Sequence, residues 1–297
     1  MCCDSLDGIA DIDWRYFLAG GLCAATSHGI TTPIDVVKTR MQTDPEKYTR
    51  GVVSATKDII ASDGVMFLLA GLGPTVVGYG LEGALKFGCY ESFKVVFKDL
   101  TKSKFVNFLA ASVIAGAVAS IVLCPMEDTR IRMVGDPNYA NENLVSALMR
   151  IIKEDGMFKT FKGLNAMLSK QVPYTMTKQV SFDIISKIFY SLAAKYLPDV
   201  SKDKIKMPIS ISSAFLTSIL ACLGSQPGDM ILTEYYKNHA NKTFSEIVGN
   251  IYSKHGFGGF FIGVIARLMH VSSIITSQLV IYDVVKIALG LQASGAH

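Results

Sequence analysis

The stretch LCPMEDTRIRM at residues 123–133 decides the fold of this chain, because related stretches precede and follow it at similar distances. Residues 32–41 read TPIDVVKTRM, and residues 226–235 read QPGDMILTEY. Each of the three stretches contains a proline with an acidic residue two positions later. A motif that recurs at a long, regular interval indicates that the chain is built from structural repeats.

A pair of glycines follows each proline motif with the same period. The first glycine ends a short amphipathic segment, and the second comes seven residues later. Glycine suits the end of a helix and the close packing of one helix on another. The amphipathic segments are residues 52–64, 144–156 and 244–256. We therefore predict three repeats, at residues 14–100, 104–195 and 207–292.

Long uncharged runs indicate helices that cross a membrane. Four such runs have 18 to 22 residues, close to the roughly 20 residues that span a hydrocarbon layer of about 30 Å. They are residues 16–34, 64–81, 105–126 and 207–228. Residues 165–192 and 268–282 are weaker candidates, because the first contains charges and the second is short. We predict an all-α membrane protein with six transmembrane helices and three short amphipathic helices at the membrane surface.

The composition supports a membrane protein and argues against other classes. Half of the 297 residues are apolar and 18% are charged, compared with roughly 25% in ordinary soluble domains. The net charge is only +4, and the six cysteines show no zinc-binding spacing. We therefore expect no metal site, no nucleic-acid partner and no disulfide scaffold. The motifs of common hydrolases and nucleotide-binding enzymes are also missing, so we expect neither an enzyme nor a cofactor.

Charged residues beside the three prolines suggest a gate. A base follows the acid by three residues in the first two copies, and the third copy has Leu232 at that position. A proline bends a helix, so three bent helices could converge at their acids, where acid and base on different helices would bridge and close a passage. The gate residues are Asp35, Lys38, Glu127, Arg130 and Asp229.

A second set of charges lies near the far ends of the even-numbered helices. It again has the spacing acid, two residues, base, with the base missing from one copy. Two gates that cannot both be open suit alternating access to a central site. The second gate would consist of Glu91, Lys94, Asp183, Asp283 and Lys286.

Polar residues in the middle of the predicted helices indicate what passes between the gates. Bases outnumber acids among them, so a small anion is the favoured cargo. Arginine can hold oxyanions in a fork, and lysine supplies a point charge. Some of these lysines could instead reach toward lipid headgroups. The candidate binding residues are His28, Lys86, Lys170, Gln171, Lys178 and Arg267.

These motifs resemble the signature of the mitochondrial carrier family, which is Pro-x-acid-x-x-base followed by acid-Gly and aromatic-base-Gly. The second copy matches it best, with Pro125, Glu127 and Arg130, then Asp155-Gly156 and Phe161-Lys162-Gly163. The resemblance implies a monomeric, multi-pass carrier in the mitochondrial inner membrane. It also implies contacts with membrane lipids, among which cardiolipin is a candidate. The proline gate would face the matrix and the second gate the cytosolic side.

The same resemblance implies a pairing of the gate charges. At the matrix gate, Asp35 would bridge Arg130, Asp229 would bridge Lys38, and Glu127 would face Leu232 without a partner. At the cytosolic gate, the implied bridges are Asp183 with Lys286 and Asp283 with Lys94. Each gate would therefore have two bridges, and two bridges are easier to reopen than three.

Within the family, several strings most resemble the phosphate carriers. They include LCPME at residues 123–127 and KQVPY at residues 170–174. This resemblance implies transport of inorganic phosphate, with proton symport and hydroxyl exchange both open. The two acids that phosphate carriers have in the third helix are replaced by Gly116 and Ser120, and His270 replaces a methionine. Another small anion, copper, or a non-transporting scaffold of the same fold are the alternatives.

Overall fold

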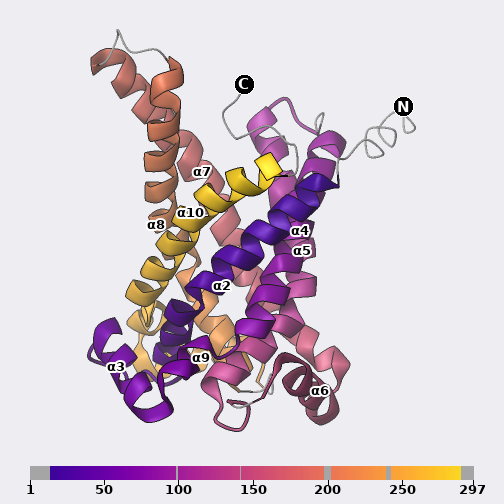
Figure 1. Ribbon diagram of the computed structural model, residues 1–297, viewed down its shortest axis with the longest axis vertical. Coiled ribbons are helices and arrows are strands. Elements are labelled where there is room, and N and C mark those ends of the chain that lie inside the picture. The colour runs from indigo at the N-terminus through magenta and orange to yellow at the C-terminus, as the bar shows by residue number, and fades with distance from the viewer. Residues whose placement is uncertain (1–13, 98–99, 141, 197–201, 239–241, 289–297) are drawn as a thin grey trace.

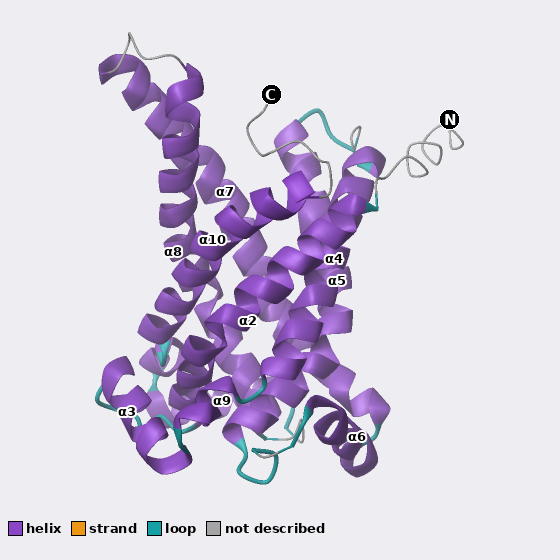
Figure 2. Cartoon of the chain, in the orientation of Figure 1, coloured by secondary structure: helices purple, strands orange, loops and turns teal. Residues whose placement is uncertain are grey.

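The structure is a computed structural model that describes residues 14–97, 100–140, 142–196, 202–238 and 242–288. Every regular element in these residues is helical (Figure 2). The long helices are α2 (Arg15–Thr43), α4 (Leu72–Val96), α5 (Lys104–Gly135), α7 (Leu164–Tyr196), α8 (Lys202–Lys237) and α10 (Val264–Ala288). The short ones are α3 (Val52–Asp63), α6 (Leu144–Asp155) and α9 (Phe244–His255), each followed by a 3-10 turn at Val65–Leu69, Met157–Gly163 and Phe257–Phe261. The predicted order of long, short and long helix is therefore present in each third of the described chain.

The long helices form a closed ring. Each long helix packs against the next one in sequence, and α10 packs against α2. The short helices α3, α6 and α9 all lie at one end of the ring, and α2 begins and α10 finishes at the opposite end (Figure 1). The two ends of the ring therefore differ. We call the end beside the short helices the proline end and the opposite end the open end.

The three proline-containing helices converge at the proline end. Pro33, Pro125 and Pro227 lie inside α2, α5 and α8, and these three helices contact one another as well as their neighbours in the ring. A proline inside a helix removes one backbone hydrogen bond and bends the helix. The bend brings the acidic residues that follow each proline toward the axis of the ring.

Glycine ends each of the short helices. Gly64, Gly156 and Gly256 follow α3, α6 and α9 with φ angles of 85°, 87° and 62°. This left-handed backbone is accessible to glycine at little cost, and a side chain there would be strained. The threefold placement of these glycines thus fixes where each surface helix turns back into the membrane.

An ion pair ties two of the short helices to the preceding long helix. Arg40 lies 3.2 Å from Asp63, and Arg132 lies 2.7 Å from Asp155. Burial alone would raise the pKa of the Asp155 carboxyl, but hydrogen bonds from Lys159 and Arg132 outweigh burial and hold this pKa below its ordinary value. The first two repeats therefore have the same electrostatic link at the proline end.

The third repeat lacks this link. Glu234 and His255 occupy the positions that Arg and Asp take in the other two repeats. The ion pair of Glu234 is formed with Lys237, in its own helix, at 3.9 Å. The threefold symmetry of the proline end is therefore broken at the third repeat.

By length and composition, four helical stretches in the described residues could cross a membrane. They are Val65–Tyr90, Lys104–Gly135, Pro208–Lys237 and Phe257–Ile275. Three of them overlap predicted uncharged runs. The predicted run 16–34 is not among them, because Ser27, three threonines and His28 lower its mean hydropathy although it carries no charge. The segment predicted as weak near residues 268–282 overlaps the fourth.

Close backbone contact between α7 and α8 depends on one glycine. A methyl group at Gly228 would lie 2.3 Å from the backbone oxygen of Ser169. Small residues allow membrane helices to approach closely, and a larger side chain forces them apart. Gly249 in α9 offers a control, because nothing lies within 4 Å of the equivalent point.

We predict that Gly228→Ala lowers the thermal stability of the purified protein in lipid nanodiscs, at a cost of about 1–3 kcal/mol or more from the steric conflict. Gly249→Ala should leave the melting temperature unchanged or raise it, because alanine favours the helix by about 1 kcal/mol. Equal melting temperatures for the two variants would show that α7 and α8 do not pack as described.

Candidate functional site: a central cavity and its gate

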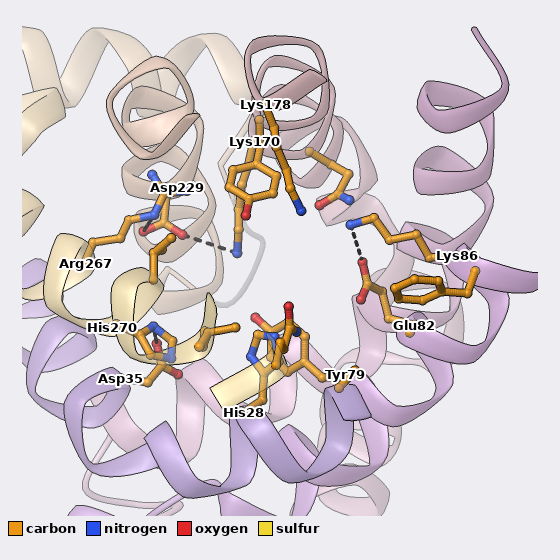
Figure 3. Close-up of a pocket in the computed structure, with 18 of the residues that line it drawn as sticks. His28, Asp35, Tyr79, Glu82, Lys86, Lys170, Lys178, Asp229, Arg267 and His270 are labelled. Carbon is orange, nitrogen blue, oxygen red and sulfur yellow. Dashed lines mark hydrogen bonds and ion pairs between the residues drawn. The ribbon is translucent and has the colours of Figure 1, made fainter. Parts of the chain in front are cut away.

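A cavity of about 340 Å³ lies inside the ring, between the helices. Side chains from all six long helices line it, and Figure 3 shows several of them pointing into a common space. The six predicted binding residues all belong to this lining: His28, Lys86, Lys170, Gln171, Lys178 and Arg267. The sequence therefore identified side chains that the fold does bring together, although their role in binding stays a prediction.

The guanidinium group of Arg267 is held by helix α8. Its Nη2 donates to Ser225 Oγ at 2.7 Å, and its Nη1 donates to Gln226 Oε1 and to the backbone oxygen of Cys222, both at 3.1 Å. Its Nε lies 3.6 Å from Asp229 Oδ2. In this conformation Arg267 ties α10 to α8, and its charge reaches the cavity from a fixed position.

Two other cavity lysines flank an aromatic ring. The Nζ atoms of Lys86 and Lys178 lie 6.0 and 5.9 Å from the ring centre of Tyr174. Lys86 also pairs with Glu82 one helical turn earlier, at 3.1 Å. Lys178 thus lines the cavity.

The proline end of the cavity is closed by ion pairs between helices. Asp35 of α2 contacts Arg130 of α5, and Lys38 of α2 lies 3.1 Å from Asp229 of α8. Both pairings are the ones that the family resemblance implies. All four side chains are at most 5% exposed, so these charges are removed from water and depend on one another.

The expectation that Glu127 has no partner is wrong. Arg130, one turn later in α5, donates to both carboxylate oxygens of Glu127 at 2.8 and 3.0 Å. Lys170 Nζ lies 3.3 Å from Glu127 Oε1, and the Tyr79 hydroxyl donates to Oε2 at 3.3 Å. Leu232, which was expected to face Glu127, is buried in an apolar cluster. A buried carboxylate without partners would cost several kcal/mol, which explains why neighbouring helices supply them.

Sequence reasoning missed three side chains that support the gate. Gln42 donates to Asp229 at 3.0 Å. His270 Nδ1 lies 3.3 Å from Asp35, and the Tyr79 ring stacks on His28 with ring centres 3.8 Å apart. His270 follows Gly263 by seven residues, as the predicted residue Lys170 follows Gly163, so this shared register was the signal that could have found His270.

The predicted cytosolic gate is described only in part. The side chains of Glu91, Lys94, Asp283 and Lys286 lie outside the described residues. Asp183 pairs with Lys187 of its own helix at 2.6 Å, and both side chains are exposed, at 40% and 75%. The cavity is therefore sealed at the proline end, whereas Asp183 at the other end is accessible to solvent.

Gly116 and Ser120, which replace two acids of the carriers that the sequence resembles, lie in α5 and make other contacts. A methyl group at Gly116 would lie 3.3 Å from Gln171 Nε2, so Gln171 packs directly against this glycine. The hydroxyl of Ser120 donates to the backbone oxygen of Gly116 at 2.8 Å. No carboxylate therefore faces Gln171 from these two positions.

A closed ring of long helices, threefold repetition, and a charged cavity that is sealed at one end are features of a membrane solute carrier. Comparison with known proteins agrees with this class. The mitochondrial carrier protein family matches residues 13–100 and 101–192 of this chain. The chain therefore belongs to the mitochondrial carrier family, with an all-α membrane fold.

Relatives match nearly the whole chain. Mitochondrial substrate carrier family protein N of Dictyostelium discoideum is 39% identical, over 93% of this chain and 95% of the relative. The probable mitochondrial phosphate carrier protein of Schizosaccharomyces pombe is 33% identical, over 94% and 91% of the two chains. Solute carrier family 25 member 3 of Homo sapiens is 30% identical, over 92% and 76%.

The gate makes a specific prediction for a double-mutant cycle with Asp35→Asn and Arg130→Gln. Each single substitution removes one partner from a buried charge that keeps others, since Arg130 also contacts Glu127 and Asp35 also lies 3.5 Å from Lys38, and should destabilise the protein by about 1–3 kcal/mol. The double variant should be destabilised by clearly less than the sum, because both charges are then gone. Thermal unfolding in lipid nanodiscs measures the three variants, and additive effects would contradict the pairing.

Proposed function

We propose that this chain carries inorganic phosphate across the mitochondrial inner membrane by alternating access. The observation that carries the proposal is the cavity, where five cationic side chains face three carboxylates. The cations are Lys38, Lys86, Lys170, Lys178 and Arg267, and the carboxylates are Asp35, Glu82 and Asp229. The surplus of positive charge favours a small anion, and relatives whose names include phosphate carrier match most of the chain.

The asymmetry of the ring supports alternating access. The proline end is closed by buried ion pairs, and at the other end, among the side chains that the structure describes, Asp183 pairs with Lys187 of its own helix. A carrier must close one end before it opens the other, so Asp183 would exchange Lys187 for Lys286 when the cytosolic gate closes. By analogy with the family, the proline end would face the matrix.

The remaining expectations are parts of the same proposal. The three repeats at residues 14–100, 104–195 and 207–292 would each contribute one third of the barrel, in a monomer whose outer surface contacts lipid. Large apolar side chains such as Ile30, Phe215 and Ile265 are exposed on the long helices, as a lipid-facing surface requires. Among the alternative cargoes, copper has no support from the described residues, where no group of His, Cys, Asp or Glu is arranged to hold a metal ion.

Uptake of phosphate into proteoliposomes tests the proposal, with and without a pH gradient. The wild-type chain should take up phosphate at a rate that responds weakly to the gradient, because Gly116 and Ser120 supply no titratable group. Lys86→Gln should weaken the apparent affinity by about ten- to a hundredfold, since it removes a charged hydrogen-bond donor from the cavity. Lys57→Gln, an exposed charge on α3, serves as the matched control.

The possible outcomes separate the competing functions. An absence of phosphate uptake, with uptake of another small anion, would replace the cargo and keep the carrier. An absence of uptake of every anion tested would favour the scaffold of the same fold. A strong acceleration by the pH gradient would show that proton coupling survives without acids at positions 116 and 120.

A further inference from the structure

The gate has an incomplete third side. Helices α2 and α5 are joined by Asp35 and Arg130, and helices α8 and α2 are joined by Asp229 and Lys38. The equivalent pair between α5 and α8 would need a base at position 232, where the chain has leucine. The apolar side chain of Leu232 cannot neutralise Glu127.

Lys170 of α7 closes this third side. Its Nζ lies 3.2 Å from Asp229 Oδ1 (Figure 3). The same Nζ lies 3.3 Å from Glu127 Oε1, so one ammonium group joins α8 to α5. Three buried gate carboxylates face only two bases from the proline helices, and Lys170 supplies the missing positive charge. Arg267 approaches Asp229 as well, but its terminal nitrogens bond to α8, so it does not join the two helices.

Lys170 differs from the other gate cations in its access to the cavity. It reaches the gate from an even-numbered helix, and its side chain is 15% exposed, compared with 3% for Lys38 and 2% for Arg130. Lysine has a flexible stem and a single charged atom that can change partners. An anion in the cavity can therefore compete with the two carboxylates for the same ammonium group.

We propose that Lys170 is a cargo-responsive latch that completes the gate when the cavity is empty and leaves it when an anion binds. This inference rests on the proposed function, because it requires an anionic cargo. Binding of the anion would draw Lys170 away from Glu127 and Asp229. The bridge that Lys170 forms between α5 and α8 would then be lost, and the closed state would be weakened. The absence of a base at position 232 then allows the gate to respond to cargo, because a permanent cation there would keep the gate closed whether or not cargo is bound.

A buried reporter at the gate tests the latch without any transport. Thr39 is fully buried in α2, next to Lys38, and its hydroxyl has no partner, so Thr39→Cys is a mild change. In a background without the native cysteines, the labelling rate of this cysteine by a maleimide in nanodiscs reports opening of the proline end.

Without anion, Lys170→Gln should raise the labelling rate about tenfold, because the third side of the gate is lost; a factor of ten corresponds to about 1.4 kcal/mol. Lys178→Gln removes another cavity lysine that has no gate contact and should leave this cargo-free rate unchanged. Adding Leu232→Lys to Lys170→Gln should restore slow labelling. Fast labelling in that double variant, or equal rates for the two lysine variants, would overturn the latch.

A second arm adds saturating inorganic phosphate. Phosphate should speed labelling of the otherwise wild-type protein and should not speed labelling of Leu232→Lys, whose gate keeps its own cation. Equal acceleration in both proteins would overturn the coupling of cargo to the gate. Cargo-free rescue by Leu232→Lys together with no effect of phosphate would support Lys170 as the third gate cation and refute phosphate as the cargo.

Discussion

Three carboxylates are buried where the proline-containing helices converge, and cations from several helices keep them there. Removal of a carboxylate from water costs several kcal/mol unless a close partner compensates for it. Asp35, Glu127 and Asp229 are each at most 5% exposed, and each contacts at least two positively charged or hydrogen-bonding side chains. The closed end of the barrel thus depends on a complete set of partners, and loss of one cation affects all three helices.

The backbone makes this cluster possible. Prolines bend α2, α5 and α8 toward the axis, and glycines allow the neighbouring helices to approach until side chains from α4, α7 and α10 reach the cluster. Tyr79, Lys170 and His270 each come from one of those helices and each contact a gate acid. Residues that line the cavity therefore also support the gate, and this shared use is the physical basis of the coupling that we propose between cargo and closure.

The repeats are not equivalent, and the differences collect in the third one. It has leucine where the others have a gate base, and Glu234 with His255 where the others have Arg with Asp. The first two repeats consequently carry an ion pair between long and short helix, at Arg40–Asp63 and Arg132–Asp155. The third repeat is the part of the proline end with the fewest fixed electrostatic links among the described residues.

Much of this arrangement could be predicted from sequence, because the repeat register fixes which residues face the axis. The surface helices and their terminal glycines follow from that register, whereas the pairs Asp35–Arg130 and Lys38–Asp229 were expected from the resemblance to the mitochondrial carrier family. The partners of Glu127 could not be predicted, because Lys170 and Tyr79 lie in α7 and α4, outside the proline motifs. Whether their side chains are long enough to reach Glu127 depends on the distances between the helices, which the sequence does not give. One of the three hydrogen bonds that hold Arg267 to α8 goes to the backbone oxygen of Cys222, which no side-chain pattern records.

The central claim is that one end of the ring is closed while the cavity is accessible from the other, and that cargo reverses the two. Distances between paired spin labels test it most directly, with Leu18 and Ile188 labelled near the open end and Lys57 and Lys153 near the proline end. Phosphate should shorten the first distance and lengthen the second. Distances that stay constant, or that change in the same direction at both ends, would contradict alternating access by this barrel.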